Sequence, residues 1–433
     1  MTKIIDAGSG KQPDSIERRT FIRKSAVAAA VGVTAIQAPF VHASRTVKLR
    51  VMGTHVTLQE AIRKKAMADL GIELIFEPKG EAELVQKATT QPDSFDVYEQ
   101  WTDSIRQLWQ ADAIQPIETE RITRWSEINQ LSKTGRIAEN ASVGKGDAPY
   151  KILNVQANHR LGAEYTGKIS FLPYVHNTDS FGYNTQFIER GVPYETESWG
   201  WLFDPRWRGK VSIVNAPTIG IFDLALAAQA KKLMAFNDIG DMSVGEINQL
   251  FDIAIDLKKS GHFAGFWNTV PQSVDFMRNG RVIIQSMFSP GVSSANGMGI
   301  PVTYAAPKEG YRAWHGVMCL SKSCAGHRKE AAYAYMNWWL DGWAGAFIAR
   351  QGYYISNPER SRPMLSEAEW DYWYEGKPAA QSLKGTDGKV SVREGEIRTG
   401  GSYKTRFSHV AVWNTVMRNY DYSLQRWYEF LLT

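Results

Sequence analysis

The sequence predicts an α/β protein of two lobes, each built on a mixed sheet flanked by helices, with a ligand cleft between the lobes. Strand-like and helix-like segments alternate from residue 46 onward, as is typical of α/β units with parallel strands. The alternation occurs twice along the chain, and a later segment leads back toward the first unit. Two lobes joined by more than one crossing leave a cleft, which is a common place for a small-molecule site.

The first lobe is predicted from five segments. Apolar and β-branched runs predict strands at 47–53, 72–76 and 95–98, and amphipathic spacing predicts helices at 58–70 and 81–90. Ligands of parallel sheets bind where the carboxyl ends of the strands meet. The residues that follow the third strand are therefore candidate ligand contacts, namely Gln100, Trp101 and Thr102.

The middle of the chain predicts a second unit of the same class. Strands are expected at 180–184, 209–215 and 281–287, and helices at 221–232 and 244–260.

Later segments return the chain to the first lobe and then complete the second. The segment 301–307 leads back, a strand is expected at 314–320, and a helix follows at 328–340. The chain is expected to end in an aromatic-rich helix from about Val410 to Leu431. We therefore assign residues 44–177 plus 306–355 to lobe 1 and residues 178–305 plus 356–433 to lobe 2.

The first 43 residues are expected to be a signal peptide of the twin-arginine (Tat) type. Arg18 and Arg19 are followed by Phe21 and by a modestly apolar run at 26–39, and Val41-His42-Ala43 is typical of a cleavage site. The apolar run is shorter than the roughly 20 residues that a membrane span needs. We expect cleavage after Ala43 and a periplasmic product.

Composition excludes several classes of protein. The 433 residues are 43% hydrophobic and 22% charged, which is typical of globular proteins and not of disordered, collagen-like or polytopic membrane proteins. The net charge of +5 falls to +2 once residues 1–43 are set aside, which is too weak for a nucleic-acid-binding surface. Cys319 and Cys324 could form a local disulfide or remain free thiols.

Motifs for catalysis and for cofactor binding are missing from the sequence. There is no Cys-x-x-Cys, His-Glu-x-x-His or Gly-x-Ser-x-Gly, and no Gly-x-Gly-x-x-Gly follows a predicted strand. None of the eight histidines pairs with another at metal-ligand spacing. We therefore predict no catalytic residue, cofactor or metal. Two alternative functions stay open, namely a ferric-ion-binding protein that uses Tyr353 and Tyr354, and an enzyme exported through the Tat pathway.

The 15 tryptophans divide into two groups. Those on predicted helices are expected to pack in the interior, and they are Trp338, Trp339, Trp343, Trp413 and Trp427. Trp101, Trp267 and Trp314 fall at predicted strand ends or in loops, where a ring can stack on a ligand or make a cation–π contact. His315, next to Trp314, is a further candidate contact.

A series of short motifs points to a known family. Upstream lies Glu197-Ser198-Trp199-Gly200-Trp201-Leu202-Phe203-Asp204-Pro205, then Phe276-Met277-Arg278-Asn279-Gly280-Arg281-Val282, then Ala306-Pro307-Lys308-Glu309-Gly310 before Trp314, and finally Gln351-Gly352-Tyr353-Tyr354-Ile355-Ser356-Asn357-Pro358. In this order and spacing the motifs resemble the periplasmic spermidine/putrescine-binding protein family of ABC importers, over most of residues 46–360.

The resemblance implies a type II periplasmic-binding fold that closes on its ligand like a hinged clamp. It implies a solute-binding protein without catalytic activity. The partners that it implies are a small organic solute and an ABC permease of the inner membrane, and we expect the protein to be a monomer.

The resemblance also shows where this chain departs from the family. In the family, carboxylates hold the polyamine ammonium groups at positions that correspond here to Pro217, Gly220 and Gly316. A buried ammonium without a carboxylate loses its hydration uncompensated, so a linear di- or triamine is a poor fit. The chain favours a compact neutral, zwitterionic or anionic solute, and a quaternary ammonium held by aromatic rings stays open.

Two further positions follow from the family's cleft. Trp314 is kept, Phe288 replaces the family's other cleft tryptophan, and Arg406 falls near the segment that lines the cleft. The complete set of predicted ligand contacts is Gln100, Trp101, Thr102, Asn215, Thr218, Trp267, Asn268, Phe288, Ser289, Trp314, His315 and Arg406.

Overall fold

A computed structural model describes residues 46–433 of the chain. The predicted signal peptide, residues 1–43, lies outside the described residues. Within the described part, no helix combines the length and the apolar character that crossing a membrane requires.

A 12-stranded mixed sheet organises the described residues. Its main path, from one edge to the other, is β11 (Phe263–Trp267), β10 (Val211–Val214), β12 (Ile284–Met287), β9 (Leu172–Asn184), β14 (Tyr311–Ser321), β3 (Val97–Trp101), β1 (Lys48–Gly53) and β2 (Glu73–Pro78). Four short strands attach to its two central members, namely β13 (Val302–Tyr304) and β15 (Tyr354–Ile355) on β9, and β18 (Val410–Trp413) and β4 (Ile114–Gln115) on β14.

The pairing directions divide this sheet into two parallel parts. β1 pairs in parallel with β2 and β3, and we call these three strands the first half. β10 pairs in parallel with β11 and β12, which form the second half. β9 and β14 lie between the halves and pair antiparallel with each other and with their neighbours on the main path, whereas the short β18 pairs in parallel with β14. The mixed α/β architecture predicted from the sequence is confirmed.

The two central strands are long and completely buried. β9 has 13 residues and β14 has 11, and every residue of both strands is buried. The first part of β9 pairs with β14, with Asp179 opposite Arg312, whereas its last part pairs with β12, with Tyr183 opposite Ile284. β9 is therefore hydrogen-bonded to β12 of the second half, β14 to β3 of the first half, and the two long strands to each other.

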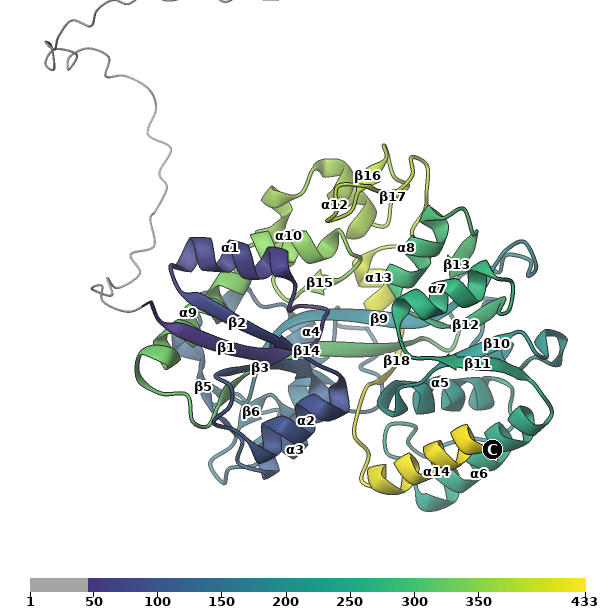
Figure 1. Ribbon diagram of the computed structural model, residues 1–433, viewed down its shortest axis with the longest axis horizontal. Coiled ribbons are helices and arrows are strands. Elements are labelled where there is room, and N and C mark those ends of the chain that lie inside the picture. The colour runs from purple at the N-terminus through teal and green to yellow at the C-terminus, as the bar shows by residue number, and fades with distance from the viewer. Residues whose placement is uncertain (1–45) are drawn as a thin grey trace, which may run out of the picture. The chain divides into compact units, whose positions relative to one another are not determined.

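Helices cover both faces of each half (Figure 1). In the view of Figure 1, α1 lies above the first half and α2 and α3 lie below it, while α7 and α8 lie above the second half and α5, α6 and α14 lie below it. Their bounds are α1 (Glu60–Leu70), α2 (Glu81–Thr90), α3 (Ile105–Gln110), α5 (Pro217–Ala230), α6 (Val244–Lys259), α7 (Val270–Arg278), α8 (Ser289–Gly297) and α14 (Tyr420–Leu432).

Local sequence explains where several helices begin. α6 starts with a capping box, in which the Ser243 hydroxyl accepts from the Glu246 amide while the Glu246 carboxylate accepts from the Ser243 amide. α5 starts with Pro217, whose missing amide hydrogen is harmless at the first helical position. The residues of α5 are small or apolar on nearly all sides of the helix, and the helix is buried from Thr218 to Ala228.

Six further α-helices and two small sheets belong to the described part of the chain. Helices in this group are α4 (Gln130–Thr134), α9 (Gly326–Trp339), α10 (Trp343–Ala349), α11 (Pro358–Ser361), α12 (Glu367–Trp373) and α13 (Tyr403–Phe407). Two small sheets complete the fold, one of β5 (Ile117–Glu118), β8 (Lys168–Ile169), β6 (Asn154–Val155) and β7 (Leu161–Gly162), and the other of β16 (Leu383–Lys384) and β17 (Val390–Val392).

Three large hydrophobic clusters form the core. One is built on the first half with α9 and α10, and the second on the second half with α5, α6 and α14. A third joins α12 and α13 to β15 and β18 and contains Trp370, Trp373 and Trp413. Cys319 and Cys324 are both buried and both free thiols.

One predicted helix is partly wrong. Residues 410–413 form strand β18 against β14, and the terminal helix begins only at Tyr420. The segment reads Val-Ala-Val-Trp, and its β-branched and aromatic side chains favour a strand once a partner strand lies beside them.

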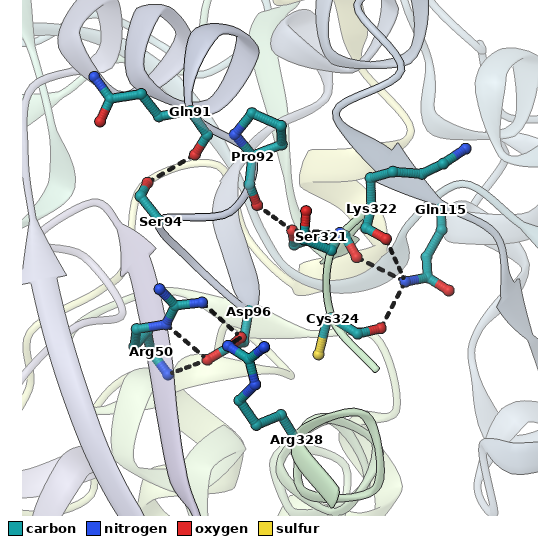
Figure 2. Close-up of polar contacts among 11 residues, drawn as sticks. Arg50, Gln91, Pro92, Ser94, Asp96, Gln115, Ser321, Lys322, Cys324 and Arg328 are labelled. Atoms are coloured by element: carbon teal, nitrogen blue, oxygen red, sulfur yellow. Dashed lines mark hydrogen bonds and ion pairs between the residues drawn. The ribbon is translucent and has the colours of Figure 1, made fainter. Parts of the chain in front are cut away.

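Ionic and polar contacts fix the turn that leads from β14 into α9 (Figure 2). The fully buried Asp96 carboxylate accepts from Arg50 on β1 at 3.0 and 3.1 Å and from Arg328 on α9 at 2.9 Å. The Gln115 side-chain amide donates to the carbonyls of Ser321 at 2.7 Å and Cys324 at 2.9 Å. The Asp96 carboxylate thereby links β1 to α9, and the Gln115 side chain holds the turn that precedes α9.

Candidate functional site

Most of the predicted ligand contacts lie at or just beyond the carboxyl ends of parallel strands. Trp101 ends β3 and Trp267 ends β11, while Asn215 follows β10 and Phe288 follows β12. Strands that run in parallel bring these ends to one edge of each half. The sequence therefore locates a set of aromatic and amide side chains at the strand ends of both halves.

Three aromatic rings gather at the end of the first half. The rings of Trp101 and Trp314 have centroids 4.4 Å apart, and the Trp314 ring meets Tyr353 edge-on at 5.6 Å. Trp101 is half-buried, whereas Trp314 and Tyr353 are 5% and 8% exposed. We call these three residues the Trp314 group, and Trp101 is its most accessible member.

A second aromatic pair lies at the end of the second half. Trp267 and Phe288 meet edge-on with centroids 5.1 Å apart. The Trp267 indole donates to the Ser286 carbonyl at 3.0 Å and the ring is buried, whereas Phe288 is half-buried. The buried Trp267 ring therefore packs against Phe288, and Phe288 is the more accessible ring of this pair.

Amide side chains follow β10 and β11. The Asn215 amide donates to the Asn268 side-chain oxygen at 2.8 Å, and the Asn215 oxygen accepts from the Trp427 indole at 3.3 Å. Asn215 is half-buried and Asn268 is exposed. Their mutual hydrogen bond fixes two neutral groups at this edge, each with capacity left for another partner.

Gln100 and Thr102 present polar atoms that no described residue satisfies. Both residues are buried, and within residues 46–433 neither the Gln100 amide nor the Thr102 hydroxyl has a hydrogen-bond partner. A buried polar group without a partner is expensive and uncommon in native proteins. Within the described residues, these atoms therefore have hydrogen-bonding capacity that the protein leaves unused.

Thr218, at the start of α5, contacts the first half directly. Its hydroxyl donates to the Glu81 carboxylate of α2 at 2.7 Å. Burial raises the pKa of Glu81. Burial and the nearby Glu81 charge also raise the pKa of the fully buried Asp103 well above its usual range. Two carboxyl groups that hold protons more tightly than usual thus lie where α2, α5 and the end of β3 approach one another.

His315 lies inside the protein, although the sequence places it among the predicted contacts. Neighbouring residues on a strand point to opposite faces, so His315 turns away from the side that bears the Trp314 ring. Its two ring nitrogens contact the Ser132 hydroxyl and the Gly316 carbonyl, both at 2.9 Å, and the ring stacks on His176 at 4.8 Å. Burial lowers the pKa of His315 to about 4. Both ring nitrogens of His315 therefore have partners within the protein, as expected for a structural histidine.

Arg406 and Ser289 line a cavity of about 420 Å³ that the strand-end aromatic rings do not line. Arg406 is 1% exposed and donates to the Thr178 hydroxyl at 3.0 Å and to the Thr399 carbonyl at 2.7 Å. Ser289 is the first residue of α8, directly after Phe288. The predicted contacts thus fall into a set at the strand ends and a pair at this neighbouring cavity.

The two adjacent tyrosines considered as ferric-ion ligands, Tyr353 and Tyr354, have different neighbours. Tyr353 packs on Trp314, whereas Tyr354 lies among His176, Tyr403 and Phe407. Within residues 46–433, no group of three or more His, Cys, Asp or Glu is placed to hold a metal ion. The two phenol oxygens therefore belong to separate environments.

Sequence reasoning missed several charged residues near the sheet junction. Arg312 on β14 is fully buried, its Nε donates to Asp223 at 2.8 Å, and one Nη lies 3.6 Å from Asp179. Burial raises the pKa of Asp179 to about 6. Glu81 and Asp103 were also missed. Their partners are distant in sequence, so no local pattern marks them.

Comparison with known proteins identifies the family. Residues 61–373 match the model of the bacterial extracellular solute-binding protein family. The chain belongs to this family. Members are solute-binding proteins of ABC transporters and not enzymes, so this protein is a solute-binding protein of an ABC transporter.

Solved structures show the same fold at low identity. The TpPotD lipoprotein of Treponema pallidum has 11% identity and a TM-score of 0.62, and the alignment covers 89% of this chain and 100% of that one. The spermidine/putrescine-binding protein PotD of Streptococcus pneumoniae has 14% identity and a TM-score of 0.59, with the same coverage. MotA of A. tumefaciens B6, solved with glucopine, has 12% identity and a TM-score of 0.56 and again covers 89% and 100%.

The resemblance to the spermidine/putrescine-binding proteins and the type II periplasmic-binding fold are therefore confirmed. Curated proteins give no match to the chain.

Proposed function

We propose that this solute-binding protein captures a small organic solute between the two sets of strand ends and delivers it to an ABC permease of the inner membrane. The observation that supports this most directly is the placement of the Trp314 group at the end of the first half and of Phe288, Asn215 and Asn268 at the end of the second. Rings and neutral amides provide stacking and hydrogen bonding without a fixed charge.

We also propose that the molecule works as two lobes, residues 44–177 plus 306–355 and residues 178–305 plus 356–433. The hydrogen bond from Thr218 to Glu81 joins a residue of each lobe and supports a closed arrangement of the two. Closure around a solute excludes water and strengthens each polar contact.

The proposed solute is not a linear polyamine, and two close approaches of the backbone support this. A Cβ added at Gly316 would lie 2.9 Å from the Val175 carbonyl oxygen, and one at Gly220 would lie 2.4 Å from the Trp427 ring. Neither position has room for a carboxylate side chain without rearrangement. Pro217 has no charge to offer, so the three carboxylates that the family uses for ammonium groups have no equivalent here.

Binding measurements on the mature protein test both parts of this proposal. We expect a thermal-shift screen of amines, amino acids, organic acids and sugars to give a ligand, and calorimetry with putrescine and spermidine to give no binding at micromolar concentrations. Micromolar or tighter polyamine binding would overturn the solute assignment.

Two tryptophan variants test the proposed site. Trp314→Ala should weaken binding of the screened ligand at least tenfold, because the ring is expected to contact the solute. Trp207→Ala is the matched control, since Trp207 is half-buried beside Arg206 and away from the strand ends. Equal affinities of the two variants would show that the solute binds elsewhere.

We further propose that residues 1–43 direct export through the Tat pathway to the periplasm. Replacing Arg18 and Arg19 by lysines should retain the precursor inside the cell, and N-terminal sequencing of the exported protein should begin at Ser44. A mature protein that still begins with Met1 contradicts this assignment.

A further inference from the structure

A cavity of about 420 Å³ lies between α8, β13 and the segment around β17. α8 and β17 lie side by side, and both appear at the upper right of Figure 1. The cavity volume lies within the range of about 300–1,000 Å³ that is common for small-molecule sites. The space is therefore large enough for an organic molecule of modest size.

The charges around this cavity are strongly one-sided. Four arginines line it, Arg190, Arg393, Arg398 and Arg406, against a single acidic residue, Glu396. Within residues 46–433, no carboxylate lies within 4.0 Å of any of the four guanidinium groups. Most other buried or half-buried arginines of the protein do have such partners, as Arg50 and Arg312 show. The cavity therefore carries a surplus of positive charge.

Two of the arginines form its buried floor. Arg398 is 8% exposed and donates to the carbonyls of Trp373 at 2.9 Å and Gly352 at 2.8 Å. Arg406 is 1% exposed, and its Nε has no hydrogen-bond partner among the described residues. Backbone carbonyls hold both side chains in place but do not neutralise their charge. A buried charge without a counter-charge is costly, and an anion in the cavity would remove that cost.

The single carboxylate is already engaged with protein groups. Glu396 accepts from the Arg393 backbone amide at 3.1 Å and lies 3.4 Å from the Tyr372 hydroxyl. It therefore shapes the rim of the cavity and leaves the guanidinium groups to another partner.

The uncharged lining distinguishes an organic anion from an inorganic one. Val292, Ile300 and Trp373 supply apolar surface, and Ser289 and Asn296 supply hydroxyl and amide groups. An inorganic phosphate would leave this apolar surface exposed to water. A carbon skeleton that bears a carboxylate would cover the surface and present two oxygens to a planar guanidinium fork.

We propose that this cavity binds a small organic acid, whose carboxylate meets Arg398 and Arg406 while Arg190 and Arg393 attract it at the mouth. The proposal rests on the proposed function, since it takes the protein to be a solute receptor, and it adds a solute class and a place that holds it. The acid is bound beside the strand ends and not by the Trp314 group.

Exposed arginines allow a test that preserves the fold. Arg190 and Arg393 are exposed, so the double variant Arg190→Gln/Arg393→Gln should remain folded. Arg208→Gln, which removes the same charge from an exposed residue outside the cavity, is the matched control. The probes are succinate, citrate, the neutral analogue succinamide and inorganic phosphate, measured by calorimetry at low salt.

We expect at least one of the two organic acids to bind, with succinamide and phosphate at least tenfold weaker. The double variant should lose about tenfold or more of the organic-acid affinity, as expected for lost charge-assisted contacts, whereas Arg208→Gln should bind as the wild type does. The proposal is overturned if neither organic acid binds, if phosphate binds as tightly as the acids, or if the double variant and the control have equal affinity.

Trp314→Ala separates this proposal from the preceding one. Organic-acid binding that depends on Trp314 and not on the arginines leaves the proposed function standing and rejects the cavity. Binding that depends on the arginines and not on Trp314 supports the cavity, and the strand-end site is then tested separately by the screened ligand with Trp314→Ala and Trp207→Ala.

Discussion

The Thr218 hydroxyl donates a hydrogen bond to the Glu81 carboxylate at 2.7 Å, across 137 positions of sequence. Thr218 lies in the first turn of α5, which packs on the second half of the sheet, and Glu81 begins α2, which covers the first half. The two hydrophobic clusters that these helices belong to are separate. One polar contact thus joins α5 of the second half to α2 of the first half.

Thr218→Val should shift the protein toward a more open arrangement. The substitution keeps the side-chain shape and removes a donor, and a net hydrogen bond contributes about 1 kcal/mol, or roughly fivefold in an equilibrium. Small-angle scattering should show a larger radius of gyration for the variant. Thr134→Val is the control, because the Thr134 hydroxyl contacts only neighbours in sequence among the described residues, the Gln130 carbonyl and the Arg136 backbone amide. Identical scattering from both variants would contradict the proposed role of the contact.

Gly220→Ala should destabilise the protein by about 1–3 kcal/mol, the usual cost of overpacking a core. The added Cβ would meet the Trp427 ring at 2.4 Å and the Val214 carbonyl oxygen at 2.7 Å. Gly245→Ala, at an exposed position of α6 where the added Cβ would meet only Ser243 Oγ at 4.0 Å, should instead stabilise by up to about 1 kcal/mol. Urea unfolding midpoints measure both effects, and a neutral Gly220→Ala would mean that Trp427 moves freely.

Glu99 should make the protein less stable as pH rises toward neutrality. The residue is fully buried and accepts from the Tyr174 hydroxyl at 3.0 Å, and burial raises the pKa of its carboxyl from 4.5 to about 7. Between these two values the folded state retains a proton that the unfolded state releases. The stabilisation from this group is therefore complete below pH 4.5 and is lost as pH rises through about 7.

Glu99→Gln removes this titration. Between pH 4.5 and about 8, the free energy of unfolding of the wild type should fall by roughly 2–3 kcal/mol relative to the variant. Urea unfolding across this range measures the difference. The exposed Glu120→Gln should follow the wild type, and parallel curves for Glu99→Gln and wild type would show that the carboxyl titrates alike in both states.

Arg312→Gln should be among the most destabilising single changes in the protein, at about 3–5 kcal/mol. It leaves the buried Asp223 without the guanidinium that now lies 2.8 Å away, and Asp179 without the one at 3.6 Å. The double variant Arg312→Gln/Asp223→Asn removes one of the stranded charges and should recover part of the loss. Chemical denaturation measures the stability of both variants. A double variant that is no more stable than the single variant would show that the destabilisation comes from lost packing and not from the unpaired charge.

Much of the secondary structure can be predicted because its signals are local. The helix predicted at 81–90 coincides with α2, and the predicted strands of both halves lie within two or three residues of those observed. β9 shows the limit. β9 begins at Leu172, but the sequence predicts a strand only at 180–184. Pro173 and the run His176-Asn177-Thr178-Asp179 are typical of a loop. Those polar residues are buried between β14 and β15, where partners distant in sequence satisfy several of them.

The candidate site shows a similar division. The positions of residues at the strand ends can be predicted, because the order and direction of the strands bring these residues together irrespective of side-chain conformation. Arg406 and His315 cannot be placed by sequence position alone. One lies on a neighbouring cavity and the other points into the core, and both outcomes depend on how β9 passes between the two halves. Glu81 and Asp103 acquire their raised pKa values only from a contact between separate elements.

The path of β9 and β14 through the sheet also determines how the molecule should come apart. Neither half can unfold alone without breaking hydrogen bonds of β9 or β14, and these two strands are also paired with each other. Opening therefore has to occur as a bending of these strands and not as a local melting, and heat should unfold both halves in one cooperative transition. The backbone amides of Thr178 to Gly182, at the middle of β9, should be among the last to exchange with deuterium.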